Sequence, residues 1–290
     1  MEVNRNVFEI EGLECAYNHP GIRGKKVVLR IDHLAIPAGE VTIILGMSGS
    51  GKSTLIETLG LMNNTITKGR ITFTHAGIKT DICREIWNRP SDLTEIRNSH
   101  FSFIFQHDFL MPYYSPEENI LIGKLIQDPE ESSPDENMEL NKLCQKTGLN
   151  FHQINKKKTT ELSVGQKQRL SFIRAIIKNY SVIFGDEPTG NLDEVNSALL
   201  LDILTDSIRQ NKERSAILVS HNVRLSIAKA GYIIVLSPVS EEEYEVRSEN
   251  VFKRKGTGWL SGCNDLLTDS ELEAKIRNVV NISEQKITIP

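Results

Sequence analysis

The feature that most constrains this chain is the segment 46–53, which reads GMSGSGKS and fits the pattern G-x-x-x-x-G-K-[ST]. Glycines allow the backbone to bend closely around a phosphate group and to point its N–H groups inward. An apolar, β-branched run at 41–45 precedes the segment, and Leu55, Ile56 and Leu59 follow it at helical spacing. This order of strand, loop and helix predicts a nucleotide-phosphate site, and a chance glycine-serine turn explains it poorly.

The residue types of this phosphate loop each have a chemical reason. Lys52 is expected on the β- and γ-phosphates, and the hydroxyl of Ser53 is expected to hold Mg²⁺. The helix that starts near Ser53 presents unpaired N–H groups and its positive dipole end to the ligand. The expected nucleotide contacts here are Gly46, Ser48, Gly49, Ser50, Gly51, Lys52, Ser53 and Thr54. Alone, the loop fits kinases, GTPases and motors equally well.

Short β-like runs alternate with helical patterns along the chain, which predicts an α/β fold with a mostly parallel sheet covered by helices. Several of these runs end at a polar residue, notably Gln106, Asp186 and His221. The runs lie at 41–45, 71–74, 101–105, 182–184, 216–219 and 232–236.

Composition narrows the class of protein further. The net charge of −4 over 290 residues gives no electrostatic case for nucleic-acid binding. The longest charge-free stretches, 41–51 and 230–240, are too short for a membrane span, which needs about 20 mostly apolar residues. The N-terminus lacks the basic start and apolar core of a secretory signal, and the four cysteines form no CxxC pair. These features predict a cytosolic protein with reduced thiols.

A second helix start lies at 162–166, which reads LSVGQ and is followed by KQR. Ser163 and Gln166 have the spacing of a capping box, and Leu170, Ile173 and Ile177 then follow as a core stripe. Such a start offers backbone N–H groups and a hydroxyl to an anion. An ordinary capped helix is the alternative interpretation.

Two acids end the apolar run VIF, and the chain continues as PTGNLD through residue 193. A carboxylate at the end of a buried strand, Asp186, can reach Mg²⁺ through its water shell. The adjacent Glu187 is then directed at an attacking water as general base. Two solvated acids are the alternative, which does not explain the continuation.

Together these segments resemble the ABC ATPase superfamily over about residues 5–238. LSVGQ is similar to its signature motif, usually LSGGQ, with Val164 in place of the first glycine. VIFGDE is similar to its Walker B element, and PTGNLD (188–193) to its D-loop, with Asp193 as the matching acid. The segments DEPTGNLD (186–193) and FIFQHDFLMP (103–112) are similar to those of the subgroup that contains macrolide exporters, lipoprotein-releasing systems and the cell-division ATPase.

The resemblance implies a P-loop NTPase core of the RecA-like type, an antiparallel β subdomain and an α-helical subdomain at about 107–178. It also implies site residues that the local pattern does not give. Gln106 matches the Q-loop glutamine, His221 the switch histidine and Tyr17 the aromatic residue that stacks on adenine. Ser163, Gly165, Gln166 and Asp193 match residues that reach a nucleotide on the opposite subunit. The implied catalytic set is Glu187, His221, Lys52 and Gln106, and the implied metal set is Ser53, Gln106 and Asp186.

The function implied is ATP hydrolysis in a head-to-tail dimer, with Mg²⁺, that drives a separate transmembrane permease-type partner. The second subunit is either another copy or a paired ABC ATPase, and the location is the cytoplasmic face of the inner (plasma) membrane. Two alternatives remain: an ABC ATPase that regulates a membrane protein without transport, and a soluble ABC ATPase that acts on ribosomes or nucleic acid. A P-loop kinase for a small substrate gives no role to the signature and the D-loop.

The chain is therefore divided into an ATP-binding domain at 1–238 and a C-terminal extension at 239–290. Thr268 and Glu271 have capping-box spacing ahead of Leu272, Ile276, Val279 and Val280 at helical spacing. The extension is expected to hold a short amphipathic helix that packs back on the same chain, and a partner-binding helix is the alternative.

Overall fold

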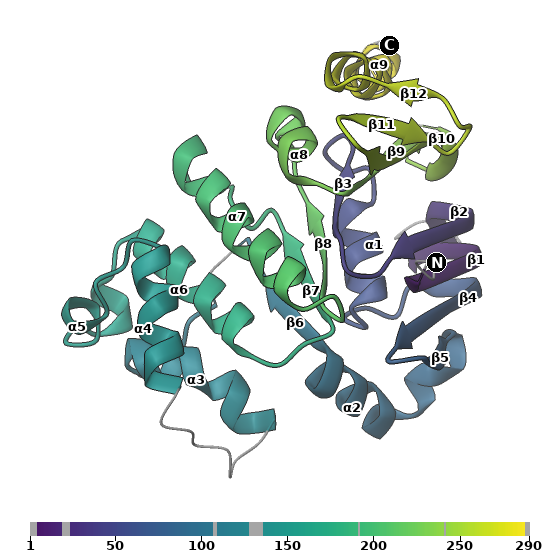
Figure 1. Cartoon of the computed structure of the whole chain (residues 1–290). Helices are drawn as coiled ribbons and strands as arrows, with labels where there is room; N and C mark the ends of the chain where they lie inside the picture. Colours follow the sequence, from purple (N-terminus) through teal and green to yellow (C-terminus); the bar gives the residue numbers. More distant parts are fainter. Residues whose placement is uncertain are drawn as a thin grey trace.

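The computed structural model describes residues 5–18, 24–106, 109–127, 136–190, 192–240 and 242–287. In this part of the chain, twelve strands form one mixed sheet with the order β5-β4-β1-β2-β10-β9-β3-β8-β7-β6, and β11 and β12 continue from β10 (Figure 1). Asn191 of the D-loop lies outside the described residues.

One half of the sheet is parallel. It comprises β9 (Tyr232–Pro238), β3 (Val41–Leu45), β8 (Ser215–Val219), β7 (Val182–Asp186) and β6 (Phe101–Ile104). β3 and β8 are buried along their whole length because helices cover both faces of the sheet. The predicted α/β fold with a mostly parallel core is confirmed, and five of the predicted apolar runs are these five strands.

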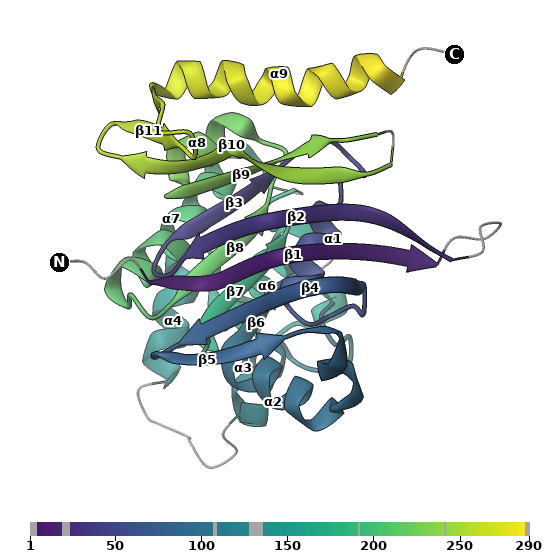
Figure 2. The same ribbon diagram turned by 90° about the vertical axis from the view of Figure 1, so that its right-hand side faces the viewer.

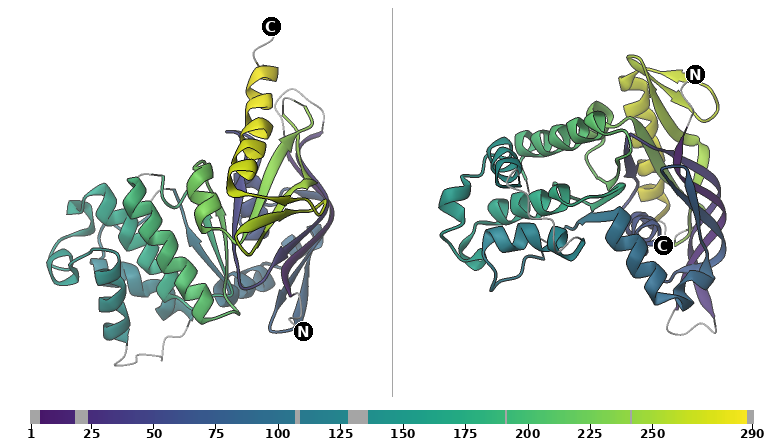
Figure 3. Two further views of the ribbon diagram at one scale, coloured as in Figure 1. Left: turned by 45° about the horizontal axis from the view of Figure 1, so that its top comes forward. Right: turned by 60° about the horizontal axis from the view of Figure 1, so that its bottom comes forward.

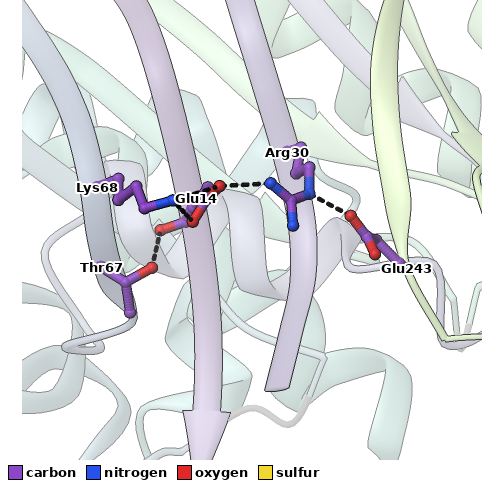
Figure 4. A network of polar contacts seen from close by, with 5 residues as sticks. All are labelled: Glu14, Arg30, Thr67, Lys68 and Glu243. Atoms are coloured by element: carbon purple, nitrogen blue, oxygen red, sulfur yellow. Dashed lines mark hydrogen bonds and ion pairs between the residues drawn. The ribbon is translucent and has the colours of Figure 1, made fainter. Parts of the chain in front are cut away.

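The other half of the sheet is antiparallel, and its buried face packs together with α1 (Lys52–Leu59). It comprises β5 (Ile78–Ile82), β4 (Ile66–His75), β1 (Asn6–Asn18) and β2 (Lys25–Pro37). A charged network crosses its outer face: Arg30 on β2 contacts both Glu14 on β1 and Glu243, and Lys68 on β4 lies 3.2 Å from Glu14 (Figure 4). Solvent-exposed pairs of this kind contribute about 0–1 kcal/mol each, so this network adds little to the stability of the sheet.

Helices cover the sheet and also form a separate lobe. α1 (Lys52–Leu59), α7 (Glu194–Gln210) and α8 (Val223–Lys229) pack on the parallel half, and α2 (Pro90–His100) follows a 3₁₀ turn at Arg84–Asn88. The lobe contains α3 (Pro116–Gln127), α4 (Glu136–Lys146), α5 (Phe151–Ile154), the 3₁₀ turn Thr159–Glu161 and α6 (Val164–Ile177) (Figures 1 and 3). The lobe has its own apolar core, which includes Ile120, Leu140, Leu170 and Ile173.

The C-terminal region holds more structure than the sequence pattern indicates. β10 (Tyr244–Lys255), β11 (Gly258–Ser261) and β12 (Leu266–Leu267) precede α9 (Asp269–Ile287), a helix of 19 residues rather than a short one. β10 inserts between β9 and β2, so part of 239–290 belongs to the main sheet. Its charged sequence concealed this strand because one of its faces is exposed. The division of the chain at residue 238 stays a proposal.

The start and packing of α9 follow the sequence. Glu271 accepts from the Thr268 N–H at 2.8 Å, the Glu271 N–H donates to Thr268 Oγ1 at 3.3 Å, and Leu272 and Ile276 are fully buried. The helix therefore packs on its own chain, as the amphipathic pattern predicts. Over the residues that the structure describes, no helix has both the length and the apolar character needed to cross a bilayer.

Candidate nucleotide-binding and hydrolysis site

Four adjacent parallel strands bring the predicted residues to one edge of the sheet. The phosphate loop follows β3, His221 follows β8, Asp186 and Glu187 end β7, and Gln106 lies just after β6. Because the strands are parallel neighbours in the order β3-β8-β7-β6, their carboxyl ends meet at the same edge. In open α/β sheets this edge is where ligands bind.

The phosphate loop has the backbone shape that its glycines allow. Gly46, Gly49 and Gly51 have φ values of 157°, 77° and 85°, which other residues rarely adopt. A Cβ on Gly46 would lie 2.6 Å from Ser50 Oγ, so the loop closes too tightly for a larger residue there. The Ser50 hydroxyl is fully buried and has no hydrogen-bond partner among the described residues. A buried, unpaired donor inside a glycine loop suits a phosphate oxygen.

Lys52 lies at the centre of this loop. Its side chain is 5% exposed, and its Nζ donates to the carbonyl oxygen of Gly46 at 3.0 Å and to that of Met47. Burial lowers the pKa of Lys52, and the nearby carboxylates of Glu187 and Asp186 oppose this shift. The two carbonyl oxygens hold the ammonium group inside the loop. In the presence of a nucleotide, phosphate oxygens could replace these carbonyl oxygens as its partners.

Glu187 and His221 face each other across the ends of β7 and β8. His221 Nε2 donates to Glu187 Oε1 at 2.7 Å, and both side chains are partly open to solvent. Glu187 has φ 48°, a left-handed conformation that is strained for a residue with a side chain. The turn that imposes it is closed by the Gly190 N–H, which donates to the Glu187 carbonyl oxygen at 3.0 Å. The fold thus holds a carboxylate and an imidazole together, beside the phosphate loop.

The three residues expected to bind a metal lie on neighbouring segments of this edge. Ser53, on the first turn of α1, is exposed; Asp186 is half-buried; and Gln106 is exposed. Hydroxyl, carboxylate and amide oxygens are the ligands that Mg²⁺ prefers, together with phosphate oxygens and water. The donor set therefore fits this ion.

Tyr17 lies at the end of β1, beside the first turn of α1. Its hydroxyl lies 3.1 Å from Thr54 Oγ1 and accepts from Asn63 Nδ2 at 3.4 Å, and the side chain is 40% exposed. Burial raises the pKa of Tyr17, so the phenol stays protonated at neutral pH. The ring thus lies next to the phosphate loop, and its contact with adenine stays a prediction.

The signature segment lies elsewhere. α6 begins with the predicted capping box: Ser163 Oγ accepts from the Gln166 N–H at 3.2 Å, and Gln166 Oε1 accepts from the Ser163 N–H at 3.0 Å. Val164 is 65% exposed. In Figure 1, α7, β7 and β8 lie between α6 and α1, so the helix that follows the signature segment lies apart from the helix that follows the phosphate loop of the same chain.

The D-loop turn connects the two regions. Asp193 caps α7 by accepting from the Asn196 N–H at 2.9 Å, a bond that lowers the pKa of Asp193. Gln168 on α6 is buried, and its Nε2 donates to the Pro188 carbonyl oxygen at 2.9 Å. The sequence analysis missed this role of Gln168. The available signal was that Gln168, a polar residue, lies only two positions before the core residue Leu170.

The model of the ABC transporter family matches residues 29–190, more than half of the chain. The chain belongs to the ABC transporter family. The resemblance inferred from the motifs is thus confirmed. The chain is accordingly an ATPase of the kind that serves as the ATP-binding subunit of a transporter.

Curated relatives of this ABC cassette lie in the predicted subgroup. The lipoprotein-releasing system ATP-binding protein LolD of Desulfotalea psychrophila is 32% identical over 216 residues, 74% of this chain and 91% of LolD. The macrolide export ATP-binding/permease protein MacB of Pasteurella multocida is 31% identical over 256 residues, 86% of this chain and 37% of MacB.

Solved structures have the same fold. The dimeric bacterial ABC transporter cassette MJ0796 superposes with a TM-score of 0.70 at 25% identity, covering 86% of this chain and 99% of that chain. The same cassette in a dimeric post-hydrolysis state bound to ADP and Pi gives a TM-score of 0.70 at 24% identity, covering 86% and 99%. These likenesses confirm the fold class.

Proposed function

We propose that this ABC cassette drives a separate transmembrane partner by closing with a second cassette around two ATP molecules and opening after hydrolysis. One observation carries the proposal: α1, which follows the phosphate loop, and α6, which follows the start of the signature segment, are separated by α7, β7 and β8 in one chain (Figure 1). Each chain thus carries a phosphate loop for one nucleotide site and a signature segment for a second site. A head-to-tail dimer joins the halves, and the two MJ0796 structures above are dimers.

In this dimer, the residues at the sheet edge take distinct chemical roles. Lys52 and the N–H groups of the phosphate loop stabilise the negative charge that develops during phosphoryl transfer. Glu187 accepts a proton from the attacking water, and His221, at 2.7 Å from Glu187, orients that carboxylate and lies toward the γ-phosphate. Ser163, Gly165 and Gln166 of the second chain contact the γ-phosphate from the other side.

Ser53, Asp186 and Gln106 would hold Mg²⁺ together with the phosphate oxygens. When bound, the ion neutralises charge on the β- and γ-phosphates. Tyr17, 3.1 Å from Thr54, would contact adenine.

An exposed apolar segment follows Gln106 and supports a membrane partner. Phe109, Met111, Tyr113 and Tyr114 are 62%, 40%, 100% and 44% exposed. Clustered exposed aromatic residues typically mark protein interaction sites. Their position just after Gln106 would let a partner sense the nucleotide. We place the complex at the cytoplasmic face of the membrane, with a permease on a separate chain, whereas MacB by its name is an ATP-binding and permease protein in one chain.

The test is the variant Glu187→Gln, purified from native membranes with Mg-ATP in mild detergent. Loss of the general base should lower turnover by about 10²- to 10⁴-fold while ATP binding persists, so ATP-bound dimer should accumulate in light scattering. A stoichiometric multi-span membrane protein should copurify. Glu213→Gln, which changes an exposed acid at the opposite end of β8, is the matched control and should behave as wild type.

Either of two results would contradict the proposal. A strictly monomeric Glu187→Gln variant with bound ATP would exclude dimer closure. Copurification of ribosomes or nucleic acid without a membrane protein would leave only the ATPase chemistry. A membrane partner whose transport is absent would identify the chain as a regulatory ATPase.

A further inference from the structure

Two neighbouring hollows flank His221 at the nucleotide edge. The first, of about 310 Å³, is lined by Gly46, Met47, Ser48, His221 and Val280, among others. The second, of about 420 Å³, is lined by Glu187, Thr189, Gly190, Leu192 and His221, among others. Ser220 and His221 line both hollows, so the two hollows are neighbours, and we refer to them together as the depression.

The C-terminal helix α9 contributes a wall of this depression. Val280 lies on α9, and its half-buried side chain lines the hollow beside Met47 and Ser48. The helix runs toward the same edge as the carboxyl end of β3, and its backbone continues to Ile287 (Figure 2). Val280 packs in part against the apolar core of its own chain, and the rest of its side chain lines the hollow.

The position of α9 is fixed by contacts earlier along the helix. Trp259 Nε1 donates to Asp269 Oδ1 at 2.8 Å, and Arg224 on α8 lies 3.0 Å from Glu273. Leu272 and Ile276 are completely buried. Val280 is therefore held at the edge of the phosphate loop by a rigid element, which is the arrangement expected of a docking surface.

The D-loop end of the depression lies next to α6, the helix of the signature segment. Leu192, which lines the second hollow, lies 3.9 Å from the position of a Cβ on Gly165 of α6. A twofold axis that places the phosphate loop of one chain against the signature of another must pass between the two, near His221 and the D-loop. The α9 side of one chain then faces the D-loop side of its partner.

An exposed apolar pair lies on that D-loop side. Val195 and Leu199, one turn apart at the start of α7, are 79% and 36% exposed. We propose that, in the ATP-bound dimer, Val280 on α9 of each chain packs against the start of α7 of a second copy, next to Val195. This inference rests on the proposed head-to-tail dimer and adds a contact outside the nucleotide itself, made twice by symmetry.

The test compares Val280→Ser with Asn278→Ser, which places the same neutral residue on an exposed position of α9, both in the full-length Glu187→Gln protein. A hydroxyl in the apolar contact, which is made twice in the dimer, should weaken ATP-dependent dimerisation about tenfold or more by sedimentation, and a neutral side chain adds no charge beside the phosphate loop, so the ATP affinity of the monomer should be unchanged by calorimetry. Asn278→Ser should match the parent. An unchanged dimer, or an equal loss of ATP affinity in Val280→Ser, would overturn the inference.

A second measurement does not depend on the stability of Val280→Ser. Val195→Cys with Val280→Cys, in a Cys263→Ser background that removes the exposed thiol, should form a disulfide-linked dimer only with ATP, and either cysteine alone should not. An ATP-dependent dimer without this cross-link would overturn the α9 contact and leave the proposed function intact. A Glu187→Gln parent that forms no dimer would instead overturn the proposed function.

Discussion

Two helices of this chain begin at segments that are expected to contact phosphate, and the two helix starts are capped differently. α1 follows Gly51, which is left-handed at φ 85° and provides no side-chain cap. α6 follows Ser163, whose hydroxyl and the Gln166 side chain satisfy two backbone N–H groups reciprocally. The start of α1 has no side-chain cap, whereas the start of α6 has a reciprocal one.

The difference indicates how each segment meets a nucleotide. The first N–H groups of a helix have no intrahelical partner, so the uncapped start of α1 offers them to a ligand. The capping box of α6 stabilises its start by about 1 kcal/mol without a ligand, and keeps it folded while the two chains are apart. The start of α1 is therefore suited to a ligand, whereas in the proposed dimer the second chain would present a signature segment that its own side chains already hold.

The largest effect is expected at the ligand-dependent start. Lys52→Ala removes the buried ammonium group from the phosphate loop, and charged hydrogen bonds are worth about 1.5–3 kcal/mol each, so ATP affinity should fall by about 10- to 100-fold. Calorimetry measures this, with the exposed Lys68→Ala as control. Equal affinities for Lys52→Ala and the control would remove Lys52 from the site.

The signature should behave differently, because its effect is expected in the other chain. Ser163→Ala should lower turnover while ATP binding to the monomer stays unchanged. In an equal mixture of Ser163→Ala and Lys52→Ala chains, half of the dimers pair one of each and regain one intact site, so ATPase activity should recover to about a quarter of wild type. Activity no higher than the mean of the two separate variants would show that both segments serve the same site within one chain.

The link between the two regions should have a smaller effect. Gln168→Leu leaves the Pro188 carbonyl oxygen without its buried donor, which should lower the free energy of unfolding by about 1–3 kcal/mol in urea denaturation. Gln210→Leu, at an exposed glutamine on α7, is the control. If both variants unfold at the same urea concentration, the bond does not tie α6 to the D-loop turn.

The far end of α6 should give an effect that is visible only as a dependence on pH. Burial lowers the pKa of Lys178 to about 8, and its Nζ donates to the Phe101 carbonyl oxygen at 2.8 Å. Between pH about 8 and about 10.4, the unfolded chain binds more protons at this lysine than the folded chain does. The unfolding free energy of wild type relative to Lys178→Met should therefore rise with pH in this window and stay level below it. A constant difference between pH 7 and 10 would contradict the lowered pKa.

Local patterns predicted the segments that depend on neighbours in sequence. The strand, loop and helix around Lys52, the capping box of Ser163 and the one of Thr268 all formed as predicted, because glycine conformation, side-chain caps and hydrophobic spacing act within a few residues. The strands of the parallel core were predicted for the same reason. Their apolar runs are short, and those of β6, β7 and β8 end close to Gln106, Asp186 and His221.

Other features required the tertiary structure. β10 reads as a charged segment and becomes a strand only because β9 and β2 provide pairing partners on both sides. The strained φ of Glu187, the bond from Gln168 to Pro188 and the place of Val280 beside Met47 join residues that are distant in sequence or held by a surrounding turn. The sequence by itself thus determined which chemical groups the chain carries and the order, along the chain, of the strands that present them. Only the tertiary structure decided which groups meet within one chain, because long-range packing separates the signature helix from the phosphate loop and brings α9 to its edge.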